Sequence, residues 1–206
     1  MARIDSFRDP GLDIWPRSGT VVLFDLEYTS WPGSLAREWS ESWEQREIVQ
    51  IGAVRAKIAD PGFTLLDTFE RLVFPLANPR LSSHFVELTG ITREQLQKEG
   101  VPFPEAWDAF SRFCRGASQL WCVGKDGEVL RENFSLRGID GDMPAPGYDI
   151  RPALARVMGV AEEEVVSSRL PELAGLNPVG RAHQALDDAR ATLKALDHLA
   201  KMGKLA

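Results

Sequence analysis

The residues with the clearest chemical potential lie in VVLFDLEYTSW, residues 21–31, where two carboxylates interrupt an apolar run. Moving an ionised carboxylate out of water costs several kcal/mol unless a partner compensates it. Residues two apart on a strand project from the same face, so Asp25 and Glu27 would point the same way and repel each other. A divalent cation bound to both carboxylates would reverse this repulsion, and the pair therefore predicts a metal site.

A second group of candidate residues lies in GRAHQALDDARATLKAL near the C-terminus. Asp187 falls on the solvated face of the predicted helix, whereas Asp188 shares a flank with small and apolar residues and needs a partner. His183 lies at the helix entrance, where a histidine that titrates near neutral pH can act as a general base. The core-facing stripe of this helix is predicted to be Leu186, Ala189, Leu193, Leu196 and Ala200.

Each of these features also has an ordinary structural explanation. An Asp-x-Glu triplet is expected about once by chance in a chain of this composition, and a strand end in solvent would account for it. A lone histidine is more often structural than catalytic. The combination of the motifs along the chain must therefore decide between the two explanations.

The elements that must position these residues begin with strands. Apolar patterning predicts strands over 20–28, 47–58 and 63–74, and a turn at ADPG joins the last two into a meander. The first of these strands is apolar on both faces, which predicts a central place in the sheet. A capping box of Thr92 with Gln95 then marks the change to helices.

The second half of the chain alternates helices with short strands. PFPEAWDAFSRFC has helical spacing, short strands are predicted at QLWCV and YDI, and GKDGEVLRENF between them predicts a turn and a helix. From Pro152 onward the pattern is mostly helical. This order predicts an α/β fold with a mixed five-stranded sheet and helices on both faces.

Composition indicates one globular domain with a full-sized core. The chain has 206 residues, of which 44% are hydrophobic and 26% charged, and its net charge of −6 excludes a broad basic surface for nucleic acid. Cys114 and Cys122 match no metal-binding spacing, so we expect reduced, partly buried thiols. There is no signal-peptide pattern and no apolar run of roughly 20 residues, so we expect a soluble, cytoplasmic protein without a membrane partner.

The motifs FDLE, EIVQIGAV, LTGIT, a lone middle aspartate and HQALDDA occur in one order along the chain. In these motifs the sequence resembles the DEDDh (DnaQ-like) 3′-to-5′ exonucleases, which have a ribonuclease H-like fold. The resemblance covers about residues 19–202. We therefore expect an exonuclease domain at 19–206, preceded by an N-terminal extension at 1–18.

The resemblance implies roles for the residues that match the family's motifs. Asp25 and Glu27 match the first motif, and His183 and Asp188 match the histidine version of the third. Two divalent cations, Mg²⁺ or Mn²⁺, are implied, with Asp25 bridging both and Glu27 and Asp188 completing one site. His183 would take a proton from the attacking water.

The middle aspartate of the family is matched by Asp126, which would hold the second cation directly or through water. It lies in VGKDGEVLREN at the end of a predicted strand and before a helix, as the family's second motif does. A helix N-cap is the alternative role for this residue. Asp140 and Asp142 are weaker candidates because no strand leads into their Gly/Pro-rich loop.

The resemblance also implies contacts with the substrate. The backbone around Leu26 and the side chain of Glu27 would meet the terminal sugar, and Leu26 could pack against the last base. Tyr28 and His84 are further candidates for the substrate groove, although His84 is also explained as a simple loop residue.

Residues 29–46 form an insertion that is longer than a tight hairpin needs and contains Trp31, Trp39 and Trp43. These rings could stack on bases. The spacing of Trp39 and Trp43 favours instead the apolar face of a short covering helix. The insertion resembles the branch of enhanced-RNAi-type and KapD-type exonucleases, which makes RNA the favoured substrate.

Three functional hypotheses follow. The favoured one is a metal-dependent exonuclease that releases nucleoside 5′-monophosphates from the 3′ end of single-stranded RNA. The second is a 3′-to-5′ exodeoxyribonuclease that trims or proofreads DNA. The third is a binding or regulatory module that kept the fold but lost catalysis, which the complete set of acids and His183 disfavours.

Overall fold

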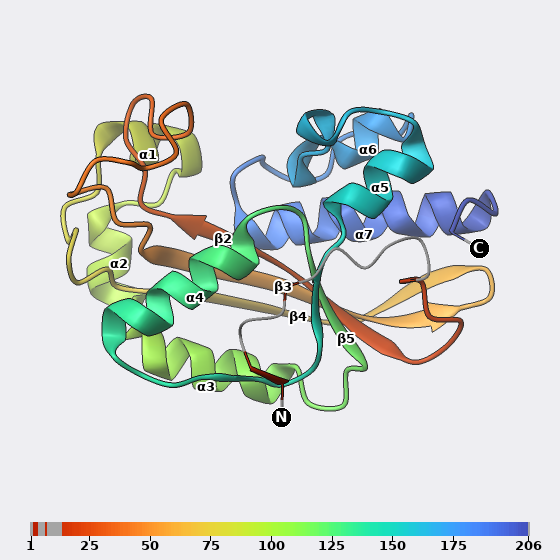
Figure 1. The fold of residues 1–206 in the computed structure, drawn as a ribbon, viewed down its shortest axis with the longest axis horizontal. Coiled ribbons are helices and arrows are strands. Elements are labelled where there is room, and N and C mark those ends of the chain that lie inside the picture. The colour runs from red at the N-terminus through yellow and green to blue at the C-terminus, as the bar shows by residue number, and fades with distance from the viewer. Residues whose placement is uncertain (1, 4–6, 8–13, 206) are drawn as a thin grey trace.

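The computed structural model describes residues 2–3, 7 and 14–205, and its centre is a mixed five-stranded sheet (Figure 1). The strands β2, β3 and β4 form an antiparallel meander, and β5 and β7 continue the sheet in parallel from β2. The predicted sheet and the central place of the first predicted strand are confirmed. The spatial order is β4 (Gly62–Leu72), β3 (Ile48–Ala59), β2 (Thr20–Tyr28), β5 (Gln119–Cys122) and β7 (Gly147–Asp149).

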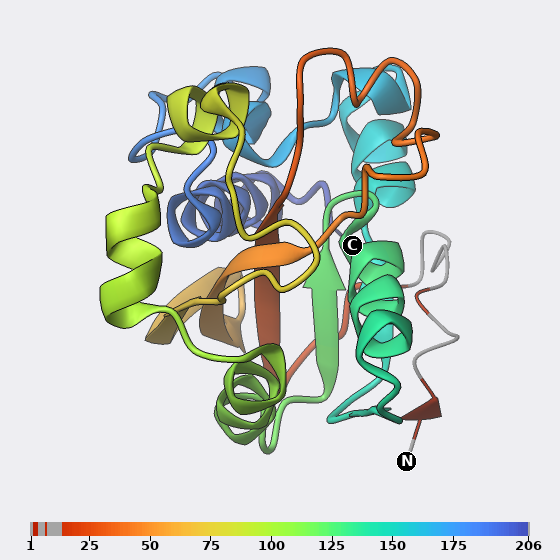
Figure 2. The same ribbon diagram turned by 90° about the vertical axis from the view of Figure 1, so that its left-hand side faces the viewer.

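Helices cover both faces of this sheet, as predicted (Figure 2). One face packs against α3 (Phe103–Phe113) and α4 (Asp126–Arg137). The other packs against α5 (Arg151–Met158), α6 (Leu170–Leu173) and the long α7 (Ala185–Lys201). This arrangement is the α/β fold class predicted from the order of strands and helices.

The side chains of β2 alternate between the two faces. Val22, Phe24 and Leu26 lie in the apolar cluster with α3 and α4, whereas Val21 and Leu23 lie in the cluster with α5 and α7. Because the period of a strand is two, Asp25 and Glu27 continue the second series and face α7.

A smaller layer flanks one end of the sheet. It contains α1 (Ser83–Thr89), which the apolar pattern did not predict, and α2 (Arg93–Glu99). The predicted capping box is confirmed, because Thr92 accepts from the backbone of Gln95 and the Gln95 side chain accepts from the backbone of Thr92. Gly90 ends α1 with a φ of 75°, a left-handed conformation that suits glycine.

Several elements complete the described chain. A two-stranded sheet pairs β1 (Ala2–Arg3) with β6 (Asp142–Met143), and short 3₁₀ turns cover Glu162–Glu164 and Ser167–Arg169. Both cysteines are buried free thiols, as predicted. None of the helices that the structure describes is long and apolar enough to cross a membrane.

Part of the segment before β2 packs on the core. Trp15 meets Trp121 edge to face at 5.5 Å between ring centroids, and Phe7 meets Phe24 at 5.7 Å. Ile14 is buried between these contacts along the chain. Phe7, Ile14 and Trp15 of the predicted extension therefore contribute to the apolar core.

The carboxyl end of β2 is left open on one side. The ladder between β2 and β5 runs from Val21 opposite Gln119 to Leu23 opposite Trp121, and β5 ends at Cys122. Beyond this point the described pairing of β2 is with β3 only. Ligand sites of α/β sheets lie where neighbouring strands diverge in this way.

Close approach of α7 to β3 depends on Gly52. A Cβ added at Gly52 would lie 2.0 Å from the backbone nitrogen of Leu186, well inside van der Waals contact. The absence of a side chain therefore lets the first turn of α7 lie directly on the sheet, next to β2.

Gly52→Ala is expected to lower the free energy of unfolding by about 2–4 kcal/mol, because the clash is with backbone atoms that cannot rotate away. Chemical denaturation measures this change. Gly116→Ala is the control, since it combines a φ of 80° with no atom within 4 Å and should cost about 1 kcal/mol. Equal losses in the two variants would contradict the argument from close approach.

Candidate active site

The carboxylates singled out in the sequence converge beside the open end of β2. Asp25 and Glu27 lie on β2, Asp126 is the first residue of α4, and Asp188 lies in the first turn of α7. Figure 1 shows the starts of α4 and α7 next to the carboxyl end of β2. Asp126 and Asp188 are both close enough to Asp25 to raise its pKa by charge repulsion.

His183 completes this group from the loop before α7. Ligand atoms of Glu27, His183 and Asp188 all lie within 4.8 Å of one another. The structure therefore brings together every residue that was predicted to be catalytic or metal-binding.

Burial makes the ionised forms of these four carboxylates energetically unfavourable. Asp25, Glu27, Asp126 and Asp188 are each at most 9% exposed. Burial is the largest cause that raises the pKa of all of them, and repulsion from neighbouring carboxylates adds to it. The pKa of Asp188 is raised to about 7. Without a cation, this site therefore favours protonated acids.

Two carboxylate oxygens at this site have no hydrogen-bond partner among the described residues. They are Oδ2 of Asp126 and Oδ1 of Asp188, and both are buried. Buried polar atoms are almost always satisfied in folded proteins, so orphaned oxygens need an explanation. Oxygen donors of this kind, grouped with a histidine, fit a hard divalent cation such as Mg²⁺ or Mn²⁺.

The alternative role of Asp126 as a helix cap is wrong. Lys125 occupies the N-cap position of α4, and no side chain caps this helix. Asp140 and Asp142, the weaker candidates for the middle aspartate, are exposed. Asp142 belongs to β6, which pairs with β1 rather than with the main sheet.

His183 is held in an unusual backbone conformation. Its φ of 60° is left-handed, which costs a non-glycine residue of the order of 1 kcal/mol. The backbone N–H of His183 donates to Oδ2 of Asp188 at 3.1 Å, and this bond helps to hold the conformation. Burial, and then the nearby Arg181, lower the pKa of His183, so its imidazole is neutral at pH 7 and able to accept a proton.

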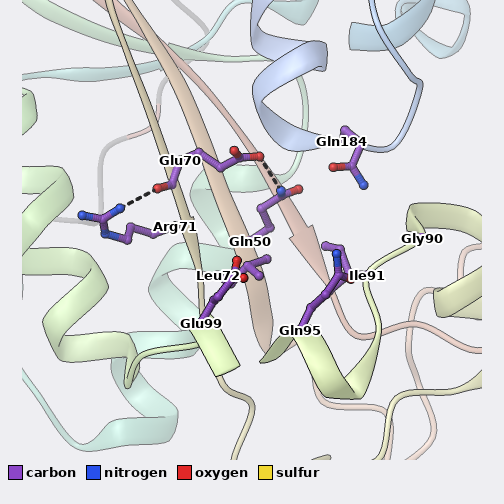
Figure 3. A pocket seen from close by; sticks show the side chains of 9 residues that line it. All are labelled: Gln50, Glu70, Arg71, Leu72, Gly90, Ile91, Gln95, Glu99 and Gln184. Atoms are coloured by element: carbon purple, nitrogen blue, oxygen red, sulfur yellow. Dashed lines mark hydrogen bonds between the residues drawn. The ribbon is translucent and has the colours of Figure 1, made fainter. Parts of the chain in front are cut away.

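A glutamine of β3 anchors the start of α7. Oε1 of Gln50 accepts from the backbone nitrogen of Ala185 at 3.0 Å, and its Nε2 donates to Glu70 at 2.8 Å. Gln50 also lies directly opposite Glu27 in the β2–β3 ladder. Figure 3 shows Gln50 between Glu70 and the start of α7, in a pocket of about 420 Å³ that adjoins the His183 loop. Gln50 thus sets the position of α7 relative to β2.

Asp187 has a role that its predicted solvated position did not suggest. Its Oδ2 accepts from the backbone nitrogen of Arg181 at 2.9 Å, and its Oδ1 pairs with Arg190 at 3.2 Å. Asp187 and Asp188 therefore have different structural roles. Asp187 holds the start of the loop, and Asp188 holds His183.

Asp149 and Ser167 also support the site and were missed from the sequence. Oδ1 of Asp149, at the end of β7, accepts from the backbone nitrogens of Gly124 at 2.7 Å and Arg151 at 2.9 Å. Burial raises the pKa of Asp126, and the charge of Arg151 offsets part of this rise. The Ser167 side chain hydrogen-bonds to Asp25. The sequence predicted the strand that ends at Asp149 but held no signal for the distant contacts of Asp149 with Gly124 and of Ser167 with Asp25.

The predicted substrate residues lie in different surroundings. Leu26 is 4% exposed in the core on the opposite face of β2, so it offers a substrate little side-chain surface. Tyr28 is partly buried against Trp39, at 5.5 Å between ring centroids. His84 is partly buried on α1, and its contact with substrate stays a prediction.

The covering helix predicted in the insertion is wrong. Residues 29–46 form turns and loops, all of them described. The indole of Trp39 donates to the backbone oxygen of Thr29 at 3.1 Å, and the Arg46 guanidinium lies over its ring. Trp39 has a φ of 53°, which a right-handed α-helix does not allow. Trp39 and Trp43 therefore do not lie on one face of a helix, although they are four residues apart.

Comparison with known proteins gives one family and a consistent fold. The model of the Exonuclease (RNase_T) family matches residues 22–196. The chain is 25% identical to 3′-5′ exoribonuclease 1 of Mus musculus over 134 residues, which are 60% of this chain and 39% of the relative. The match thus spans well under half of that relative's length.

Two solved structures show the extent of the structural likeness. The nuclease domain of 3′hExo, a DEDDh family member bound to rAMP, has a TM-score of 0.77 at 20% identity and covers 96% of each chain. A complex of Escherichia coli Exonuclease I with single-stranded DNA has a TM-score of 0.64 at 16% identity, covering 91% of this chain and 42% of the other.

The stability of the protein without metal is expected to fall as pH rises from 5 to 8 in EDTA. Asp188 has a folded pKa of about 7 against 3.8 unfolded, so the folded state binds more protons in this range. Its stabilising effect is complete below the unfolded pKa and is lost as pH rises through about 7. Thermal unfolding at several pH values should show a decrease of several degrees.

Asp126→Asn should weaken this pH dependence, because it removes one of the interacting buried acids, while the exposed Asp140→Asn should leave it unchanged. Excess Mg²⁺ or Mn²⁺ should raise the melting temperature of the wild type most at pH 8. A melting temperature that rises with pH in EDTA would contradict the charge repulsion described above.

Proposed function

Because the chain belongs to the Exonuclease family and is of its DEDDh type, we propose that it is a metal-dependent 3′-to-5′ exonuclease. Its substrate is single-stranded nucleic acid, with RNA favoured, and its products are nucleoside 5′-monophosphates. The activity resides in the described residues around the open end of β2.

One observation carries this proposal. Acids from β2, α4 and α7 meet beside a neutral histidine, and two of their buried oxygens lack a partner among the described residues. A binding module without catalysis needs neither this costly cluster nor a histidine held in a left-handed conformation. The same observation therefore supports an enzyme over an inactive member of the fold.

The acidic cluster would hold two divalent cations. Asp25, at the centre of the cluster, would contact both, Glu27 and Asp188 would complete one site, and Asp126 would serve the other. Such ions supply Lewis-acid polarisation of the phosphodiester and offset the negative charge of the site. The net charge of −6 is therefore no obstacle to a phosphate backbone at this point.

His183 would act as the general base. Its lowered pKa leaves the imidazole neutral at pH 7, and a neutral imidazole can accept a proton from an attacking water. The bond from its backbone to Asp188 keeps the ring beside the carboxylates. Asp188 therefore serves both as a metal ligand and as the anchor of the base.

Two comparisons support RNA as the substrate class. The mouse relative is named an exoribonuclease, and a further structure with a TM-score of 0.77 is a 3′-exonuclease that recognises the histone mRNA stem-loop. DNA is the second candidate, supported by the likeness to Exonuclease I in complex with single-stranded DNA. A protein can distinguish RNA through the 2′-hydroxyl, so matched substrates will separate these candidates.

Asp25→Asn is expected to lower the rate of hydrolysis of a 5′-labelled oligonucleotide by at least about 10³-fold, since it removes the central carboxylate. His183→Ala should lower kcat by about 10²–10⁴-fold, the usual contribution of a general base. Asp140→Asn is the matched control and should retain full activity. All assays contain Mg²⁺ or Mn²⁺, and EDTA should abolish wild-type activity.

Wild-type activity that survives EDTA, or full activity of Asp25→Asn, would contradict the site. Inactivity of the wild type on RNA and DNA with either metal would overturn the proposed function.

Matched RNA and DNA oligonucleotides of the same sequence should be shortened one nucleotide at a time from the 3′ end, with RNA cleaved faster. A 3′-phosphate should block the reaction, because the terminal sugar must enter the site. Denaturing gels with 5′-labelled substrates show the ladder directly. Internal fragments formed from a 3′-blocked strand would identify an endonuclease instead.

A further inference from the structure

The insertion at residues 29–46 carries exposed apolar side chains next to the active site. Trp43 is 50% exposed and Leu35 is 77% exposed. Trp31 lies edge to face against Trp43, with 5.0 Å between ring centroids. Trp31 and Trp43 together present an aromatic surface, and half of Trp43 is free to contact a ligand.

Internal contacts give the insertion a defined shape. Glu44 is 3% exposed, and its carboxylate accepts from Ser34 at 2.7 Å and from Nε of Arg37 at 3.0 Å. The hydroxyl of Ser34 also accepts from the backbone nitrogen of Trp31 at 2.9 Å. Trp31 is therefore held by this network, and Trp43, which directly precedes Glu44, packs against the ring of Trp31.

Further contacts tie the insertion to the active site. It begins two residues after Glu27, and the backbone oxygen of Ser30 at its base accepts from Ser82, the N-cap of α1. Glu38 pairs with Lys125 at 3.1 Å, immediately before Asp126. Figures 1 and 2 show the insertion as a long loop beyond the carboxyl end of β2, beside α1.

Ion pairs neutralise most charges of the insertion. Of its three acids, Glu38 is paired with Lys125 and Glu44 with Arg37, and Glu41 is exposed. An indole with half of its surface free offers a π-face on which any base can stack without sequence preference. A strand whose 3′ end lies at the acids of β2 has its preceding nucleotides close by, since the insertion begins at the same strand end.

We propose that Trp43, supported by Trp31, is a stacking site for bases that precede the 3′-terminal nucleotide of a single-stranded substrate. This inference rests on the proposed function. It adds a contact outside the metal site that holds longer strands while nucleotides are removed. Its ligand is a nucleobase in an unpaired strand, of either RNA or DNA.

The experiment compares the wild type with Trp43→Ala, Trp43→Phe and Leu35→Ala on single-stranded oligonucleotides from dinucleotide to dodecanucleotide. Trp43→Ala should raise KM about tenfold for long strands and leave kcat and the dinucleotide unchanged, because one base–aromatic contact is lost. Trp43→Phe should restore most of the affinity. Leu35→Ala, which removes an exposed apolar side chain from the same insertion, should match the wild type.

Binding measured without turnover separates this inference from the proposed function. In the His183→Ala background with Mg²⁺, fluorescence anisotropy of a labelled octanucleotide should show the same tenfold loss on Trp43→Ala. That loss supports the stacking site even if the wild type proves inactive. Unchanged affinity in Trp43→Ala, an equal loss with the dinucleotide, or an equal loss in Leu35→Ala would overturn the inference.

Discussion

The mutual repulsion of four buried carboxylates is the constraint that the rest of the structure must satisfy. Asp25, Glu27, Asp126 and Asp188 lie in one small region from which water is largely excluded, and burial raises the pKa of each. Such a cluster destabilises the fold unless protons or cations neutralise it. The cluster lowers the stability of the fold but provides a site of high cation affinity. This combination is expected at a functional site.

Contacts from neighbouring segments hold the helix starts that carry two of these carboxylates in place despite the repulsion. Gly52 lets α7 lie against β3, and Gln50 binds the first backbone nitrogen of that helix. Asp149 holds the Gly124 turn that leads into α4. The helix starts that carry Asp126 and Asp188 are thus held in place by contacts from other segments. Because the ligands are already ordered, cation binding loses little conformational entropy.

Much of this arrangement could be predicted from the sequence. The two-residue period of β2 placed Asp25 and Glu27 on one face, and the helical pattern separated Asp188 from the solvated face that carries Asp187. The predicted core stripe was less accurate, because Leu186 and Ala200 are only partly buried. Asp126 could be selected over Asp140 because a strand leads into it. These successes rest on local periodicity, which one segment reveals by itself.

The failures concern contacts between segments and irregular backbone. The spacing of Trp39 and Trp43 suggested a helix, but a left-handed residue and a hydrogen bond to Thr29 produce a compact loop instead. Asp149 binds Gly124 and Gln50 binds Ala185, and both partners lie far along the chain, so the neighbouring sequence contains no signal for these contacts. Tertiary contacts override local propensity at such positions.

The most direct test of the central claim is the number of protons released when Mn²⁺ binds. Isothermal titration calorimetry at pH 7, in two buffers of different ionisation enthalpy, measures this number. The account predicts that the wild type binds Mn²⁺ and releases protons from its site acids, and that Asp126→Asn binds more weakly and releases fewer. No Mn²⁺ binding by the wild type, or binding and proton release unchanged in Asp126→Asn, would contradict the account.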